Sequence, residues 1–186
     1  MKKIIKVFIQ EIVPIIIGIL IAMYINNWNE DRKDRKYINQ IFSSINKELA
    51  ETNDEIIDKI PLQKSLVDTL DFYSEYNKVS LIDIIIKNNG IQMPTIKMNS
   101  WKAVSNSKIE LLEYDKVSTL ANIEEQKDIF KMKAEKLATF IYSNTNKTGK
   151  DKKGLMKFMM LDIINTEISI QNYIELQVIR KNEQLN

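Results

Sequence analysis

The residue types in this chain that could do chemistry are carboxylates and lysines, because the sequence contains no cysteine and no histidine. Their absence excludes thiol nucleophiles, disulfides, zinc sites built on Cys or His, and histidine as a proton carrier near neutral pH. The acids of Glu48–Asp54 and Glu124–Asp128 have lysines at helical spacing, which is typical of solvent-facing ion pairs. Carboxylate-bridged metal centres in bundles also need Glu-x-x-His motifs. We therefore expect no enzyme activity, no catalytic or metal site and no cofactor.

One basic segment has the glycine spacing of a phosphate-binding loop, with Gly149 and Gly154 five residues apart. That motif continues with Lys and then Ser or Thr, whereas Leu155 and Met156 stand here, so the match fails. The polar stretch 143–154 is expected to be a solvated loop. The lysines in and just after it form a basic patch, which could also contact anionic lipid or an acidic partner: Lys147, Lys150, Lys152, Lys153 and Lys157.

A long apolar stretch near the N-terminus carries the candidate residues for membrane anchoring. Residues 12–25 read IVPIIIGILIAMYI without a charge, and residues 7–25 reach the roughly 20 residues that span a bilayer. A cleaved signal peptide, a buried core helix and a membrane anchor all fit this length. No small-x-small cleavage site follows, and the charged run NEDRKDRK comes directly afterwards. We predict a basic tail and transmembrane anchor over 1–28, with Tyr24 and Trp28 at the membrane interface.

Polar and small residues form a stripe along one face of this predicted helix. Glu11, Gly18, Ala22 and Asn26 follow one another at spacings of seven, four and four. Gly18 and Ala22 form a small-xxx-small pair that lets helices approach closely, and Glu11 is less costly against protein than against lipid. Two interpretations stay open. The stripe is an interface with a second copy or another membrane protein, or Pro14 and Gly18 merely kink the helix while Glu11 lies among headgroups.

The orientation in the membrane depends on the charges that flank the apolar stretch. Lys2, Lys3 and Lys6 precede it, and four basic residues of the segment 32–36 follow it, so the positive-inside rule is nearly balanced. A short basic tail before a first span usually stays in the cytoplasm. This slightly favours the outer, periplasmic side for the rest of the chain.

Composition predicts a soluble all-α domain over residues 29–186. Of 186 residues, 44% are hydrophobic and 28% charged, while glycine and proline number only 4 and 3, which suits long helices. Beyond the anchor the chain carries 24 basic and 24 acidic residues, a neutral balance that argues against a nucleic-acid partner. Apolar residues recur at three and four, and several such helices bury their faces together in a bundle.

The same periodicity predicts where the helices lie. The anchor helix is expected to run unbroken to about residue 60, where Pro61 ends it or starts the next helix. Ser80 and Ser100 are predicted N-caps of two short helices, although residues 84–86 also fit a strand. Further helices are expected over 62–77, 80–89, around Trp101, over 114–143 and over 155–184, with a loop over 91–99.

Residues 11–33, EIVPIIIGILIAMYINNWNEDRK, resemble the anchor of a bacterial family of small membrane proteins, the domain-of-unknown-function family six-zero-nine-zero. Its members show a run EI…IGILIA…INNWNE, matched here by Glu11, Ile12, Gly18, Ile19, Leu20, Ile21, Ala22, Ile25, Asn26, Asn27, Trp28, Asn29 and Glu30. A second similarity covers residues 101–123, where Asn106-Ser107-Lys108 stands in place of a common Ser-Gly turn. The resemblance implies a bacterial inner-membrane protein with a helical domain, and it implies no activity.

The function expected from these features is a membrane-anchored interaction or scaffold module that assembles through its anchor helix. One alternative is a small-ligand sensor with a cavity lined by Trp101 and polar groups. Tyr114 and Tyr142 are further candidates for such a pocket, although aromatic residues in a bundle more often fill the core. The other alternative is an oligomeric effector that perturbs membranes.

Overall fold

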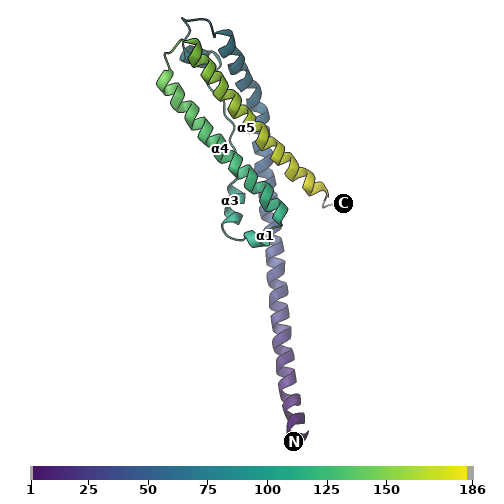
Figure 1. The fold of residues 1–186 in the computed structure, drawn as a ribbon. Helices are drawn as coiled ribbons and strands as arrows, with labels where there is room; N and C mark the ends of the chain where they lie inside the picture. The colour runs from purple at the N-terminus through teal and green to yellow at the C-terminus, as the bar shows by residue number, and fades with distance from the viewer. Residues whose placement is uncertain (1, 184–186) are drawn as a thin grey trace. The chain divides into compact units, whose positions relative to one another are not determined.

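A computed structural model describes the backbone of residues 2–183 and the side chains of residues 10–177. Within these limits the chain is all-α, as predicted (Figure 1). The elements are α1 (Lys2–Phe72), α2 (Leu81–Lys87), α3 (Asn99–Ser105), the 3-10 helix η1 (Ile109–Leu111), α4 (Tyr114–Asn144) and α5 (Lys150–Glu183). The side chains of Lys2, Lys3 and Lys6 and residue 184 of the predicted last helix lie outside the described residues.

The chain divides into two units, residues 1–43 and residues 44–186, and α1 contributes to both. The prediction of one helix running from the apolar stretch into the bundle is therefore confirmed. The two units are defined by the compactness of the chain, whereas the predicted boundary near residue 28 separates a membrane anchor from a soluble domain. That boundary stays a prediction.

The prediction that Pro61 ends a helix is wrong, because α1 continues through it to Phe72. Proline has no N–H, so the carbonyl of Ile57 lacks its helical donor. Tertiary packing on both sides of Pro61 offsets this loss. Ile56 before it, and Leu66 and Leu70 after it, are buried on the same helical face. The segment expected as a helix over 62–77 is the last part of α1.

Residues 44–186 form a bundle built on α1, α4 and α5. A short turn over 145–149 joins α4 and α5, which pack against each other as an antiparallel pair (Figure 1). The C-terminal part of α1 also runs antiparallel to α5. Three pairs of bonded side chains show this, since the α5 number falls as the α1 number rises: Asn53–Gln171, Gln63–Glu167 and Asp71–Lys157.

The short helix α2 follows the predicted capping signal. The Ser80 hydroxyl accepts the Asp83 N–H, and the Asp83 carboxylate accepts the Ser80 N–H, which completes a capping box. The alternative of a strand over 84–86 is wrong. After α2, Asn89 and Gly90 take positive φ values of 56° and 91°, and glycine adopts this conformation without strain. The chain then runs without regular structure over 91–98, close to the loop predicted over 91–99.

Ser100 does not cap α3, contrary to the prediction, because the helix begins one residue earlier, at Asn99, and Met98 is at the cap position. The side-chain oxygens of Glu48 on α1 accept the Ser100 N–H and hydroxyl at 3.1 and 2.9 Å. The carboxylate of Glu48 thus supplies the acceptor that the start of α3 needs. This acid is part of the bundle rather than the purely solvent-facing residue expected from its sequence.

The expected loop over 143–154 is also shorter than predicted, because α5 begins at Lys150. Lys153 is fully buried, and its ammonium donates to the carbonyls of Tyr73 and Tyr76 at 2.8 Å each. Lys157 pairs with Asp71 at 2.6 Å, and Lys150 pairs with Glu75. The last part of the predicted loop is therefore the start of α5, and three lysines of the basic patch hold α5 to the end of α1 and the turn after it.

One face of α5 is buried along the length of the helix. Met156, Met160, Ile163 and Ile170 are completely buried, whereas Leu155, the first residue of the predicted helix, is 45% exposed. Ile163 and Ile170 are seven residues apart, and the same spacing backwards from Ile163 leads to Met156. Leu155 is turned about 100° from this face.

Candidate functional site

The apolar stretch of α1 has no protein cover. Between Gln10 and Phe72, α1 contains an 18-residue window apolar enough to cross a membrane, and none of that window is buried. Ile15, Leu20 and Ile25 are 61%, 59% and 56% exposed. A core helix of a soluble protein would bury such residues, so the structure gives no support to that interpretation of the stretch. A membrane span and a signal segment both fit it.

The residues predicted for the anchor interface all lie on this uncovered helix. Glu11, Gly18, Ala22 and Asn26 are exposed, and they share one side because a spacing of seven or four residues returns nearly to the same helical face. A Cβ added at Gly18 would meet nothing within 4 Å. The face is therefore open to close approach by another helix, although the structure brings no partner to it.

The predicted interfacial aromatics are exposed as well. Tyr24 is 73% and Trp28 54% exposed, at the end of the apolar stretch where charged residues begin. Aromatic rings with a polar edge are enriched where lipid meets water. Their position suits that role, and the role itself stays a prediction.

The core of the bundle contains a polar pair that was not predicted from the sequence. The Gln63 amide on α1 donates to the Glu167 carboxylate on α5 at 2.7 Å and to the Gln92 carbonyl at 2.9 Å. Both side chains are buried, and Gln63 Oε1 and Glu167 Oε2 find no donor among the described residues. Burial raises the pKa of Glu167 to about 7, while the hydrogen bond from Gln63 acts in the opposite direction. Only the apolar face around Glu167 could have signalled its burial.

The indole of Trp101 is part of the packing of the bundle. Trp101 is 2% exposed, and its Nε1–H donates to the Glu124 carboxylate on α4 at 2.7 Å. Glu124, like Glu48, is therefore bonded across elements rather than facing solvent as predicted. Tyr114 is 81% exposed and lies at the start of α4.

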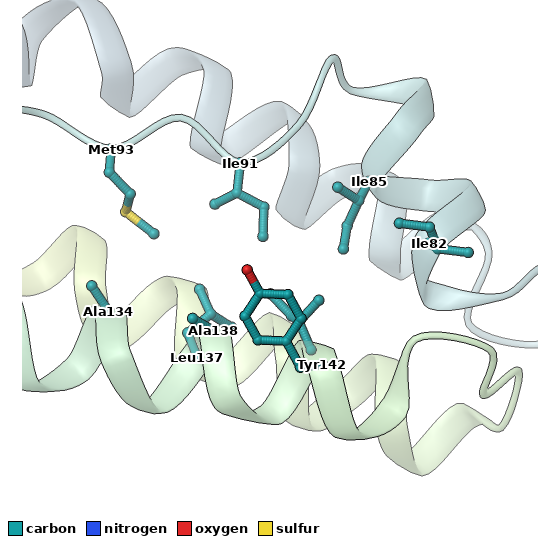
Figure 2. Close-up of a pocket in the computed structure, with 9 residues that line it drawn as sticks. Ile82, Ile85, Ile91, Met93, Ala134, Leu137, Ala138 and Tyr142 are labelled. Atoms are coloured by element: carbon teal, nitrogen blue, oxygen red, sulfur yellow. The ribbon is translucent and has the colours of Figure 1, made fainter.

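A hollow of about 310 Å³ lies between α2, the extended segment 91–93 and α4 (Figure 2). Ile91 and Met93 face Ala134, Leu137 and Ala138 of α4 across it, as Figure 2 shows. Ile82 and Ile85 of α2 and Ile141 and Tyr142 of α4 complete the lining. Of the predicted aromatic candidates, only Tyr142 belongs to this site.

The chemistry of the hollow follows from its lining. The Tyr142 hydroxyl supplies its one polar side-chain group, and Tyr142 is 83% exposed. Aliphatic and thioether groups bind apolar surface, and they offer a charged group no partner. The arrangement can bind an apolar molecule, and its lining contains no nucleophile paired with a base.

Among the residues that the structure describes, no three His, Cys, Asp or Glu side chains lie close enough to hold a metal ion. No family model matches the chain, and no curated protein or solved structure is significantly similar to it. The resemblance of residues 11–33 to a bacterial membrane family therefore stays a prediction.

Proposed function

We propose that this protein is a membrane-anchored helical interaction module without catalytic activity, which assembles with a second copy or another membrane protein through α1. The proposal is carried by the apolar window of α1, which is wholly uncovered. Leaving that much apolar surface in water costs free energy, roughly 25 cal/mol for each Å². Lipid removes this cost.

The stripe of Glu11, Gly18, Ala22 and Asn26 supports assembly as well as anchoring. The space around Gly18 is open, and lipid chains give helices no hydrophobic reason to associate, so close packing at small residues becomes decisive. A neighbouring helix would also shelter Glu11 from lipid. The family resemblance adds a bacterial inner membrane, and the flanking charges slightly favour the outer side for residues 44–186.

The first test is association of the full chain in lipid. Gly18→Leu fills the open face and should lower the crosslinked fraction in native membranes, together with the amount of any partner recovered. Leu20→Phe is the matched control, because Leu20 is turned about 200° from Gly18 and the added bulk faces away from the stripe. Equal association of wild type and both variants would refute assembly through this stripe.

A second measurement separates an anchor from a signal segment. The intact mass of the protein recovered from membranes after alkaline extraction should include residues 1–28. Recovery of a shortened, extractable chain would contradict the anchor. In that case the stripe has no role in the mature protein.

A further inference from the structure

We propose that the hollow between α2, segment 91–93 and α4 is a binding site for an uncharged, mainly aliphatic molecule with one hydrogen-bonding group. This site lies within residues 44–186, so the proposal does not depend on assembly through α1.

Hydrogen bonds to α1 hold one wall of the hollow in place. The extended segment is fixed from its α1 side, since Gln63 binds the Gln92 carbonyl at 2.9 Å and the Thr52 hydroxyl accepts the Lys97 N–H at 2.9 Å. Pro94 and Ile96 are buried between these bonds. The segment therefore cannot move freely toward α4 to close the hollow.

Small residues of α4 face this fixed wall. Ala134 and Ala138 lie one turn apart on α4 and line the hollow opposite Ile91 and Met93 (Figure 2). Alanine reaches no farther than Cβ, so each position leaves room that a larger apolar side chain would fill. A pair of alanines here thus produces the space, which the bonded wall preserves.

The size and lining define the ligand class. A volume of about 310 Å³ lies at the lower end of the roughly 300–1,000 Å³ of small-molecule pockets, so the ligand is small. The lining offers no charged side chain, so an ionised group would lose its hydration without gaining a partner. The Tyr142 hydroxyl can exchange one hydrogen bond with an alcohol or carbonyl group, and in Figure 2 it is turned toward Ile91.

The test uses 1-octanol as probe on the full chain in lipid nanodiscs, with methionine methyl groups observed by NMR. The Met93 signal should shift and saturate, because Met93 lines the hollow. Met132 is 45% exposed on α4 and is not in the lining, so its signal reports non-specific partitioning. Octanoate should bind more weakly at neutral pH, since its carboxylate finds no cation.

Variants keep the proposal falsifiable. Ala138→Phe and, from the opposite wall, Ile91→Phe should abolish the saturable Met93 shift. Ala121→Phe, at an exposed position of α4 outside the lining, should preserve it. Tyr142→Phe should weaken octanol binding roughly fivefold, which corresponds to one neutral hydrogen bond of about 1 kcal/mol. Equal, non-saturating shifts of Met93 and Met132, or unchanged binding in both filling variants, would overturn the proposal.

Discussion

The apolar stretch of α1 and the helix α5 are both rich in isoleucine, yet they expose it to opposite degrees. Ile17 and Ile19 of α1 are 49% and 55% exposed, whereas Ile163 and Ile170 of α5 are completely buried. The two regions also differ in their charged residues. Residues 12–25 carry none, while α5 buries both Lys153 and Glu167. Each region therefore needs a different surrounding.

This difference follows from which partners each helix finds. The ammonium of Lys153 meets two carbonyls and the carboxylate of Glu167 meets an amide, so the bundle compensates part of the cost of burying them. No described residue covers the apolar window of α1, so a charge there would find no partner among the described residues. The bundle thus covers α5, whereas no described residue covers the apolar window of α1, and a membrane would supply that cover.

The largest expected effect comes from placing the same polar residue in both helices. Ile163→Asn should lower the free energy of unfolding by about 4 kcal/mol, because it removes buried apolar contacts and buries an amide without a prepared partner. Ile19→Asn should leave the unfolding of residues 44–186 unchanged and reduce retention in alkaline-extracted membranes. Denaturation of the full chain in nanodiscs measures the first effect. A bundle equally destabilised by both substitutions would break the comparison.

Glu167 offers a test based on pH. Because its pKa is raised by burial to about 7, against 4.5 for an ordinary Glu, the folded chain binds more protons than the unfolded chain between these values. The contribution of Glu167 to the free energy of unfolding is fully present below pH 4.5, and it is lost as the pH rises through 7. Its size is about 3 kcal/mol.

Glu167→Gln cannot ionise and should flatten this dependence. Relative to wild type, the variant should gain about 3 kcal/mol of unfolding free energy between pH 4 and pH 8, as measured by denaturation at both values. Glu125→Gln, at an exposed position of α4, serves as the control for general charge effects. Parallel pH curves for wild type and Glu167→Gln would show that Glu167 does not titrate within the core.

Local signals allowed the sequence to predict the all-helical class, the long α1 and the start of α2. Ser80 and Asp83 form a capping box that depends only on their spacing, and the structure contains it. The prediction that Pro61 ends a helix is wrong because packing of α1 offsets the loss of one backbone hydrogen bond, and spacing alone does not reveal this packing. Of the lining of the hollow beside Met93 only Tyr142 was a predicted candidate, because the fixed wall depends on bonds between residues far apart in sequence.

Lys153 and Glu167 show the same limit for charged residues. The groups that bind them come from α1 and the turn after it, far away in the sequence. The anchor stripe is the reverse case. Its residues share a face through their spacing alone, so local sequence was enough to predict that face, and all four are exposed.

The smallest effect is expected for Lys153, because two large contributions oppose each other there. Lys153→Met leaves the carbonyls of Tyr73 and Tyr76 without their shared donor, a loss of roughly 1.5–3 kcal/mol for each bond to a charged group. The substitution also removes the cost of burying an ammonium, the same cost that lowers the pKa of Lys153. We expect a net destabilisation of about 2 kcal/mol.

The site of the loss distinguishes this role from general packing. Hydrogen exchange should speed up in residues 73–79, where the carbonyl acceptors lie, before it changes in the middle of α4. Lys152→Met, at the neighbouring and partly exposed position, should change the free energy of unfolding by less than about 0.5 kcal/mol. If Lys153→Met is as stable as wild type, the desolvation of the ammonium cancels its two bonds. The buried lysine of α5 would then hold the end of α1 in place without adding net stability, and the contrast with the charge-free stretch of α1 would concern specificity rather than free energy.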